Sequence, residues 1–139
     1  MEKSYWLLKT EPDDWSWNCQ VKSGDKGAEW NGVRNFQAAK NLKNMKMGDR
    51  CFFYHTGKSK SIVGVVKVKK EAFLDKSDKN KKFVSIIVQA LYPLKREVSL
   101  KEIKKIKDFR DFTLVKQSRL SVMGVSLKYW KKISKMGRV

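Results

Sequence analysis

The sequence is poor in the residues that build metal centres and disulfide frameworks. It holds a single histidine, His55, and two cysteines, Cys19 and Cys51, which are far apart and form no CxxC pair. We therefore expect no metal site built from His or Cys and no disulfide scaffold. Such cysteine usage is typical of an intracellular, reducing compartment. That compartment would be the cytoplasm in a bacterium, with the nucleus as a further option in a eukaryote.

Long apolar runs are also missing. No window approaches the roughly 20 apolar residues that a membrane-spanning helix needs, and residues 1–6 lack the basic stretch followed by an apolar one that marks a secretory signal. Hydrophobic residues nevertheless make up 41% and aromatic residues 12% of the chain, which excludes a disordered protein. We expect no membrane partner and a single domain over residues 1–139, because domains of about 100–150 residues are the commonest size.

Acidic residues are scarce, and most of the imbalance lies in one part of the chain. There are 32 Lys and Arg against 14 Asp and Glu, a net charge of +18. Residues 1–57 hold 9 basic and 7 acidic residues, whereas residues 58–139 hold 23 and 7. This excess indicates a polyanionic partner, for which nucleic acid is the usual candidate. Because only six of the basic residues are Arg, a merely solvated lysine-rich surface is the alternative.

The apolar patterns predict a mixed α+β domain. Ser99 followed by Glu102 has the spacing of a capping box, Ser126 is a second candidate helix cap, and Gly64 inside a strand marks a bulge or a close backbone approach. Strands of the predicted lengths need closure or cover, which favours a small barrel. We expect strands at residues 4–9, 50–56, 61–73 and 83–91, a polar connection at 75–82, helical turns at 13–17, and helices at 35–45, 100–106 and 127–136.

Two polar clusters stand at the ends of these elements. Residues 9–12 (KTEP) end the first strand, and residues 30–35 (WNGVRN) lead into the first clear helix. Trp30 offers a flat face for stacking a planar ring, and Gly32 lets backbone groups approach a ligand closely. A helix start also favours anions, so the second cluster would suit a nucleotide. The alternative is that Trp30 is a core residue and Asn35 only a helix cap.

Several motifs together resemble the EVE domain family. They are YWLLKTEP at 5–12, WNGVRNFQA at 30–38, MGD at 47–49, FYHT at 53–56, IVGV at 62–65 and RLSVM at 119–123. Motifs that follow one another at family spacing are more specific than any one alone. The resemblance implies a PUA-like β-pseudo-barrel surrounded by short helices and related to the YTH and ASCH domains. It also implies a reader of modified bases, above all modified cytosines, in DNA or RNA.

The resemblance implies where the base would bind. The pocket would comprise Lys9, Thr10, Glu11, Trp30, Asn31, Gly32, Val33, Arg34 and Asn35, with Tyr54 and His55 on an adjacent strand. We expect the phosphate backbone to contact Arg119, Ser121, Lys58 and Lys60. The chain departs from the family by having Thr10, Phe36 and Gly124 where Ser, Tyr and Pro are usual.

Three functions follow from these residues. The leading hypothesis is a non-catalytic reader of a modified base, a monomer without cofactor that binds DNA or RNA. The second is an ASCH-like hydrolase acting on a modified nucleoside, in which Lys9 would activate the Thr10 hydroxyl, although neighbouring strand residues face opposite sides. The third is a general RNA-binding module with no preference for modification.

Overall fold

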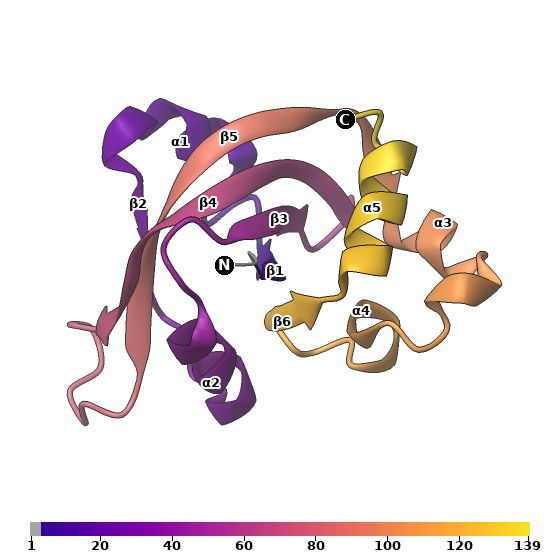
Figure 1. The fold of residues 1–139 in the computed structure, drawn as a ribbon. Helices are drawn as coiled ribbons and strands as arrows, with labels where there is room; N and C mark the ends of the chain where they lie inside the picture. The colour runs from indigo at the N-terminus through magenta and orange to yellow at the C-terminus, as the bar shows by residue number, and fades with distance from the viewer. Residues whose placement is uncertain (1–3) are drawn as a thin grey trace.

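Six strands form one mixed sheet in the computed structural model, which describes residues 4–139 (Figure 1). They lie in the order β2-β5-β4-β3-β1-β6. The pair β1 and β3 is parallel, and every other neighbouring pair is antiparallel. The strands are β1 (Tyr5–Thr10), β2 (Ala28–Trp30), β3 (Arg50–His55), β4 (Ser61–Leu74), β5 (Val84–Ser99) and β6 (Val122–Val125).

Most helices begin where the sequence supplies a side-chain acceptor, the exception being the four-residue helix at Thr113–Lys116. Asn35 accepts from the N–H of Ala38, Ser99 and Glu102 form a capping box, and Ser126 accepts from Tyr129, as capped helix starts do. No helix in residues 4–139 is long and apolar enough to cross a membrane. The helices are α1 (Trp17–Lys22), α2 (Phe36–Asn44), α3 (Leu100–Lys104), α4 (Thr113–Lys116) and α5 (Leu127–Met136), with 3-10 turns η1 (Gly24–Lys26) and η2 (Lys107–Phe109).

Strands β4 and β5 form a long hairpin that arches across the molecule (Figure 1). Their pairing register shifts at four places, which lets the two strands bend. Residues 61–66 are buried without a break, so the period-two alternation in β4 separates two covered faces rather than a core face from a solvent face. Helices α3, α4 and α5 gather at one end of the sheet, and α1 and α2 lie toward the other.

Gly64 of β4 is buried in the core and lies directly against the ring of Trp17. A Cβ at this position would come within 2.5 Å of the Trp17 ring, so the glycine admits a large side chain. The pairing register also shifts next to Gly64. The predicted bulge is therefore present, and the close approach comes from an indole rather than from backbone. Both Trp17 and Trp30 meet Phe53 edge to face, with ring centroids 5.3 and 5.6 Å apart.

Some predicted boundaries were wrong. The first helix begins at Trp17 instead of ending there, because Ser16 caps it by accepting from Cys19. Strand β5 continues to Ser99, well past residue 91; Pro93 is accommodated next to a register shift, where the ladder tolerates a missing N–H. Strands β2 and β6, of three and four residues, were not predicted because such short segments carry little periodicity.

Candidate functional site

A cavity of about 640 Å³ opens where β1 ends, beside β2 and the loop that leads to α2. Its volume falls in the range of ligand pockets, roughly 300–1,000 Å³. The structure brings both predicted clusters, residues 9–11 and 30–35, to this one cavity. The lining residues are Lys9, Thr10, Glu11, Asp14, Trp15, Glu29, Trp30, Asn31, Gly32, Val33, Arg34, Asn35 and Ser121.

Two indole rings, together with Val33, form the apolar part of the lining. Trp30 is only 7% exposed and packs against Phe53 at an interplanar angle of 82°, so it serves the core and borders the pocket at once. Trp15 is half-buried, and its Nε1 donates to Oε1 of Gln20 at 2.9 Å. The Trp30 ring is thus fixed by packing against Phe53, and the Trp15 ring by its hydrogen bond to Gln20. Sequence reasoning missed Trp15 as a pocket residue, although its place three residues after the KTEP segment was an available signal.

The polar lining carries more acidic than basic groups. Its acidic residues are Glu11, Asp14 and Glu29, and its basic residues are Lys9 and Arg34. Glu11 accepts from the Thr56 hydroxyl at 3.3 Å. Within residues 4–139, no hydrogen bond or ion pair engages the carboxylates of Asp14 and Glu29. Ionised carboxylates only accept hydrogen bonds, so this lining suits a ring that offers N–H donors and disfavours a phosphate group.

Lys9 and Thr10 are engaged with different partners. The ammonium group of Lys9 donates to the carbonyl of Ser118 at 2.9 Å, and burial lowers the pKa of Lys9. The Thr10 hydroxyl donates to the carbonyl of Trp15 at 3.0 Å. No hydrogen bond in the described part of the chain joins the two side chains. The arrangement therefore lacks the nucleophile–base contact that a Lys-activated hydroxyl requires.

A buried aspartate fixes the loop between β2 and α2. Asp75, 2% exposed, accepts from the N–H of Gly32 at 2.8 Å, from Arg34 at 3.0 Å and from Ser77. Burial alone would raise the pKa of Asp75, but the hydrogen bonds from Ser77, Gly32 and Arg34 outweigh it and hold the pKa far below its usual range. Arg34 thus braces the pocket loop against the β4–β5 connection (residues 75–83). The sequence did not reveal this role of Asp75.

Tyr54 and His55, which were predicted on a strand adjacent to the pocket residues, do not line this cavity. They sit on β3, opposite Lys9 and Thr10 of β1. Tyr54 is 3% exposed, and burial raises its pKa to about 12. Nε2 of His55 accepts the main-chain N–H of Trp17 at 3.0 Å, and burial lowers the pKa of the imidazole. A neutral His55 therefore holds the start of α1.

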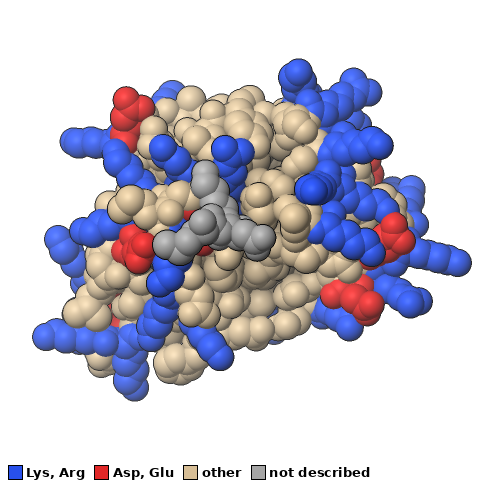
Figure 2. Space-filling view, viewed as in Figure 1, with Lys and Arg blue, Asp and Glu red and all other residues tan. Residues whose placement is uncertain are grey.

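The four predicted phosphate-contacting residues are divided among three places. Ser121 lines the pocket itself. Arg119 lies in an adjoining hollow of about 340 Å³ that shares Asn35 with the pocket. Lys58 and Lys60 line a separate hollow of about 450 Å³ together with lysines of α3. Figure 2 shows Lys and Arg side chains crowded over the side of the molecule where α3 and α5 lie.

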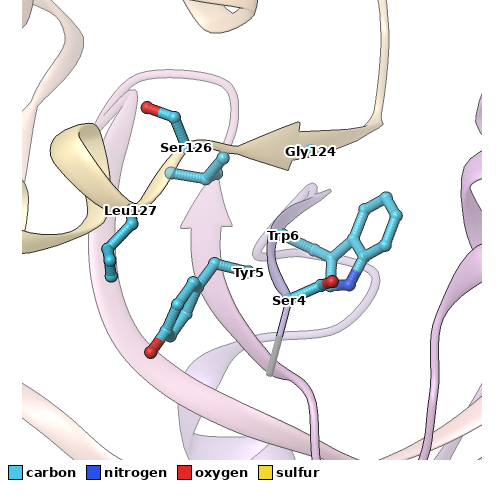
Figure 3. A pocket seen from close by; sticks show the side chains of 7 residues that line it. Ser4, Tyr5, Trp6, Gly124, Ser126 and Leu127 are labelled. Carbon is cyan, nitrogen blue, oxygen red and sulfur yellow. The ribbon is translucent and has the colours of Figure 1, made fainter. Parts of the chain in front are cut away.

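A further hollow of about 570 Å³ lies between the start of β1 and the connection from β6 to α5 (Figure 3). None of the described residues that line it is charged, and its Trp6 side chain serves the fold, because Nε1 of Trp6 donates to Asp49 at 3.0 Å. Gly124, which stands where the family usually has proline, also lines this hollow. A Cβ added to Gly124 would lie 3.8 Å from the Trp6 ring. That departure therefore does not touch the pocket described above.

Protein relatives match most of the chain. The sequence pattern of the EVE domain matches residues 4–136. Thymocyte nuclear protein 1 of Danio rerio is 32% identical over 151 residues, which cover 86% of this chain and 65% of that protein. This chain therefore spans slightly less than two thirds of that relative.

Solved structures match the fold along nearly its whole length. The NMR structure of a Rhodopseudomonas palustris protein has a TM-score of 0.92 and 43% identity, covering 97% of this chain and 93% of that one. Human THYN1 protein, crystallised in complex with DNA containing 5-methylcytosine, has a TM-score of 0.91 and 25% identity, covering 99% of each chain. These matches confirm the expected α+β, PUA-like fold, and the chain belongs to the EVE domain family.

Proposed function

We propose that this chain is a non-catalytic nucleic-acid-binding module that takes one modified cytosine into the pocket between β1 and the β2–α2 loop. The observation that carries the proposal is the pairing, in one cavity, of two fixed indole rings with the unengaged carboxylates of Asp14 and Glu29. The complex of the related human THYN1 protein with DNA containing 5-methylcytosine supports nucleic acid as the partner.

The lining matches the chemistry of cytosine. The exocyclic amine of cytosine is a hydrogen-bond donor, and Glu or Asp is the side chain that accepts from it. A 5-substituent such as a methyl group would lie against the apolar surface of Trp15, Trp30 and Val33. Burying one methyl group contributes about 0.8 kcal/mol, which corresponds to a preference of about fourfold over unmodified cytosine.

The charges separate base from backbone. Phosphates are repelled by the acidic lining, so they remain outside, where Arg119, Lys58 and Lys60 are exposed. Stacking returns about 1–3 kcal/mol per base, whereas extruding a base from a duplex costs a few kcal/mol and less from a single strand. The pocket alone therefore binds modestly, and the lysine-rich surface supplies the remaining affinity in a salt-dependent way.

The test compares oligonucleotides that differ by one methyl group. Fluorescence anisotropy with single-stranded DNA and RNA carrying one 5-methylcytosine or one cytosine should show about a fourfold preference for the modified strand. Changing Asp14→Asn together with Glu29→Gln keeps the side-chain shapes and removes both charges, and should weaken binding of the modified strand roughly 10- to 100-fold. Asp108→Asn removes a carboxylate that pairs with Lys132 on the exposed surface and serves as the matched control.

Two outcomes would contradict the proposal. Equal binding of modified and unmodified strands by the parent protein would instead indicate a general RNA- or DNA-binding module. Release of free acid from an acylated cytidine incubated with the protein would indicate the hydrolase. We expect the parent protein and a Thr10→Val variant, which lacks the hydroxyl but keeps the side-chain shape, to be equally inactive toward acylated cytidine.

A further inference from the structure

An aromatic ring stands exposed next to the pocket. Phe36, the first residue of α2, is 68% exposed, and it directly follows Asn35, which lines the pocket. Its ring stacks on that of Phe83, with centroids 5.0 Å apart and an interplanar angle of 29°. Most of the Phe36 surface still faces solvent, so its contribution to the core is small.

The support beneath this ring is fixed by hydrogen bonds. The N–H of Phe83 donates to Asp78 at 2.8 Å, and its carbonyl accepts from the N–H of Asp75 at 3.1 Å. The guanidinium of Arg34 lies 5.4 Å from the centre of the Phe83 ring. The Phe36–Phe83 pair is therefore attached to the same brace that fixes the pocket loop. A surface ordered in advance loses little entropy when a ligand stacks on it.

The surroundings of the ring are basic. The two aspartates of the β4–β5 connection direct their carboxylates to Gly32, Arg34 and the connection's own N–H groups. Its lysines are exposed, as is Lys40, one turn after Phe36 in α2. Figure 1 shows this end of the hairpin beside α2, and Figure 2 shows basic side chains projecting there. The lysines of the connection are Lys76, Lys79, Lys81 and Lys82.

We propose that Phe36 is a stacking surface for the nucleobase next to the one in the pocket, and that the surrounding lysines hold the phosphates of that flank. The inference rests on the proposed function and extends it to strandedness. A base can stack on Phe36 only if it is unpaired, and stacking on an aromatic ring tolerates any base. The protein would thus favour single-stranded flanks without adding sequence specificity.

The test separates this surface from the pocket by the size of the ligand. In Phe36→Ala and Phe36→Leu, affinity for a single-stranded nonamer carrying one 5-methylcytosine should fall roughly 5- to 100-fold, because Leu keeps apolar area but has no ring. Phe36→Tyr should stay within about twofold of the parent. Binding of free 5-methylcytidine, followed by NMR shifts, should not change in any of these variants. Met47→Ala, which alters an equally exposed apolar residue, should change neither.

Each contrary result has a distinct meaning. If Phe36→Ala binds the nonamer as tightly as the parent, the stacking surface is refuted, whatever the pocket does. If the parent shows no preference for the methylated strand, the proposed function fails, while a loss in Phe36→Ala on the unmodified nonamer would still support stacking. If the Phe36 variants alter only self-association in sedimentation velocity, the ring serves a second copy of the chain, and the inference is wrong.

Discussion

The pocket differs in charge and in burial from its rim, by which we mean Phe36, Phe83 and the surrounding lysines of the β4–β5 connection and α2. The pocket lining carries carboxylates and places Trp30 at 7% exposure, whereas the rim carries lysines and leaves Phe36 at 68% exposure. A buried ring belongs to the core as well as to the pocket, so its recognition role cannot be changed without disturbing the fold. An exposed ring contributes little to the core, so it can be replaced without disturbing the fold. We therefore expect the two surfaces to respond differently to mutation.

The two regions are nevertheless joined through Asp75. Asp75 accepts from Gly32 and Arg34 on the pocket side, and its N–H donates to Phe83 under the rim. A change at Asp75 should therefore affect both regions, while changes at Trp30 or Phe36 should separate them. The predictions below run from the largest expected effect to the smallest.

Trp30→Ala should lower the free energy of unfolding by about 3–5 kcal/mol, because it empties a large buried site against Phe53. Phe36→Ala should lower it by less than about 1 kcal/mol. Urea denaturation at pH 7 measures both. Trp30→Phe keeps an aromatic ring in the core and allows binding to be measured in a folded protein. Equal destabilisation by Trp30→Ala and Phe36→Ala would abolish the distinction between pocket and rim.

Asp75→Asn should cost about 2–3 kcal/mol, because it removes the acceptor charge from hydrogen bonds to Gly32, Arg34 and Ser77. Asp111→Asn, which alters an exposed pair with Lys116, should cost less than about 1 kcal/mol. The same urea titrations provide the values. We also expect Asp75→Asn to weaken oligonucleotide binding, since it loosens pocket and rim together.

The contribution of Asp75 should depend on pH. Its pKa in the folded protein lies far below the ordinary value of 3.8, so its stabilisation is complete above about pH 5 and is lost as the pH falls toward the folded pKa. The stability gap between the parent and Asp75→Asn should thus be constant from about pH 5 to 8 and shrink below about pH 4. A gap that grows on acidification would show that the carboxylate is not the stabilising form.

Lys58→Gln combined with Lys60→Gln should have the smallest effect. These side chains are exposed, so stability should hardly change. If each contacts one phosphate, the slope of log affinity against log salt should fall by about 1.4 for a single strand. Lys22→Gln with Lys26→Gln, which alters exposed lysines at α1 and η1 away from α3 and α5, is the control. If the slope of log affinity against log salt is the same in the Lys58→Gln/Lys60→Gln variant as in the control variant, the lysines of the hollow beside α3 are solvated and contact no phosphate.

Local signals allowed much of the fold to be predicted. The caps at Asn35, Ser99 and Ser126 lie within three residues of the groups they bind. The spacing around Ser99 and Ser126 therefore located two helices, and the apolar period of residues 35–45 located a third. The two polar clusters that line the pocket were also visible as motifs. By contrast, β2 and β6 gain their structure from pairing with distant strands, and segments of three or four residues carry no recognisable period.

The sequence by itself determined an α+β domain, a basic surface and the two segments that meet at the pocket. Only the tertiary structure decided that Asp75 braces Gly32 from 43 residues away, that His55 supports α1 from behind, and that Phe36 rests on Phe83. The reason is physical: helix caps and strand periods depend on neighbours along the chain, whereas these contacts depend on how the hairpin and α2 pack in space.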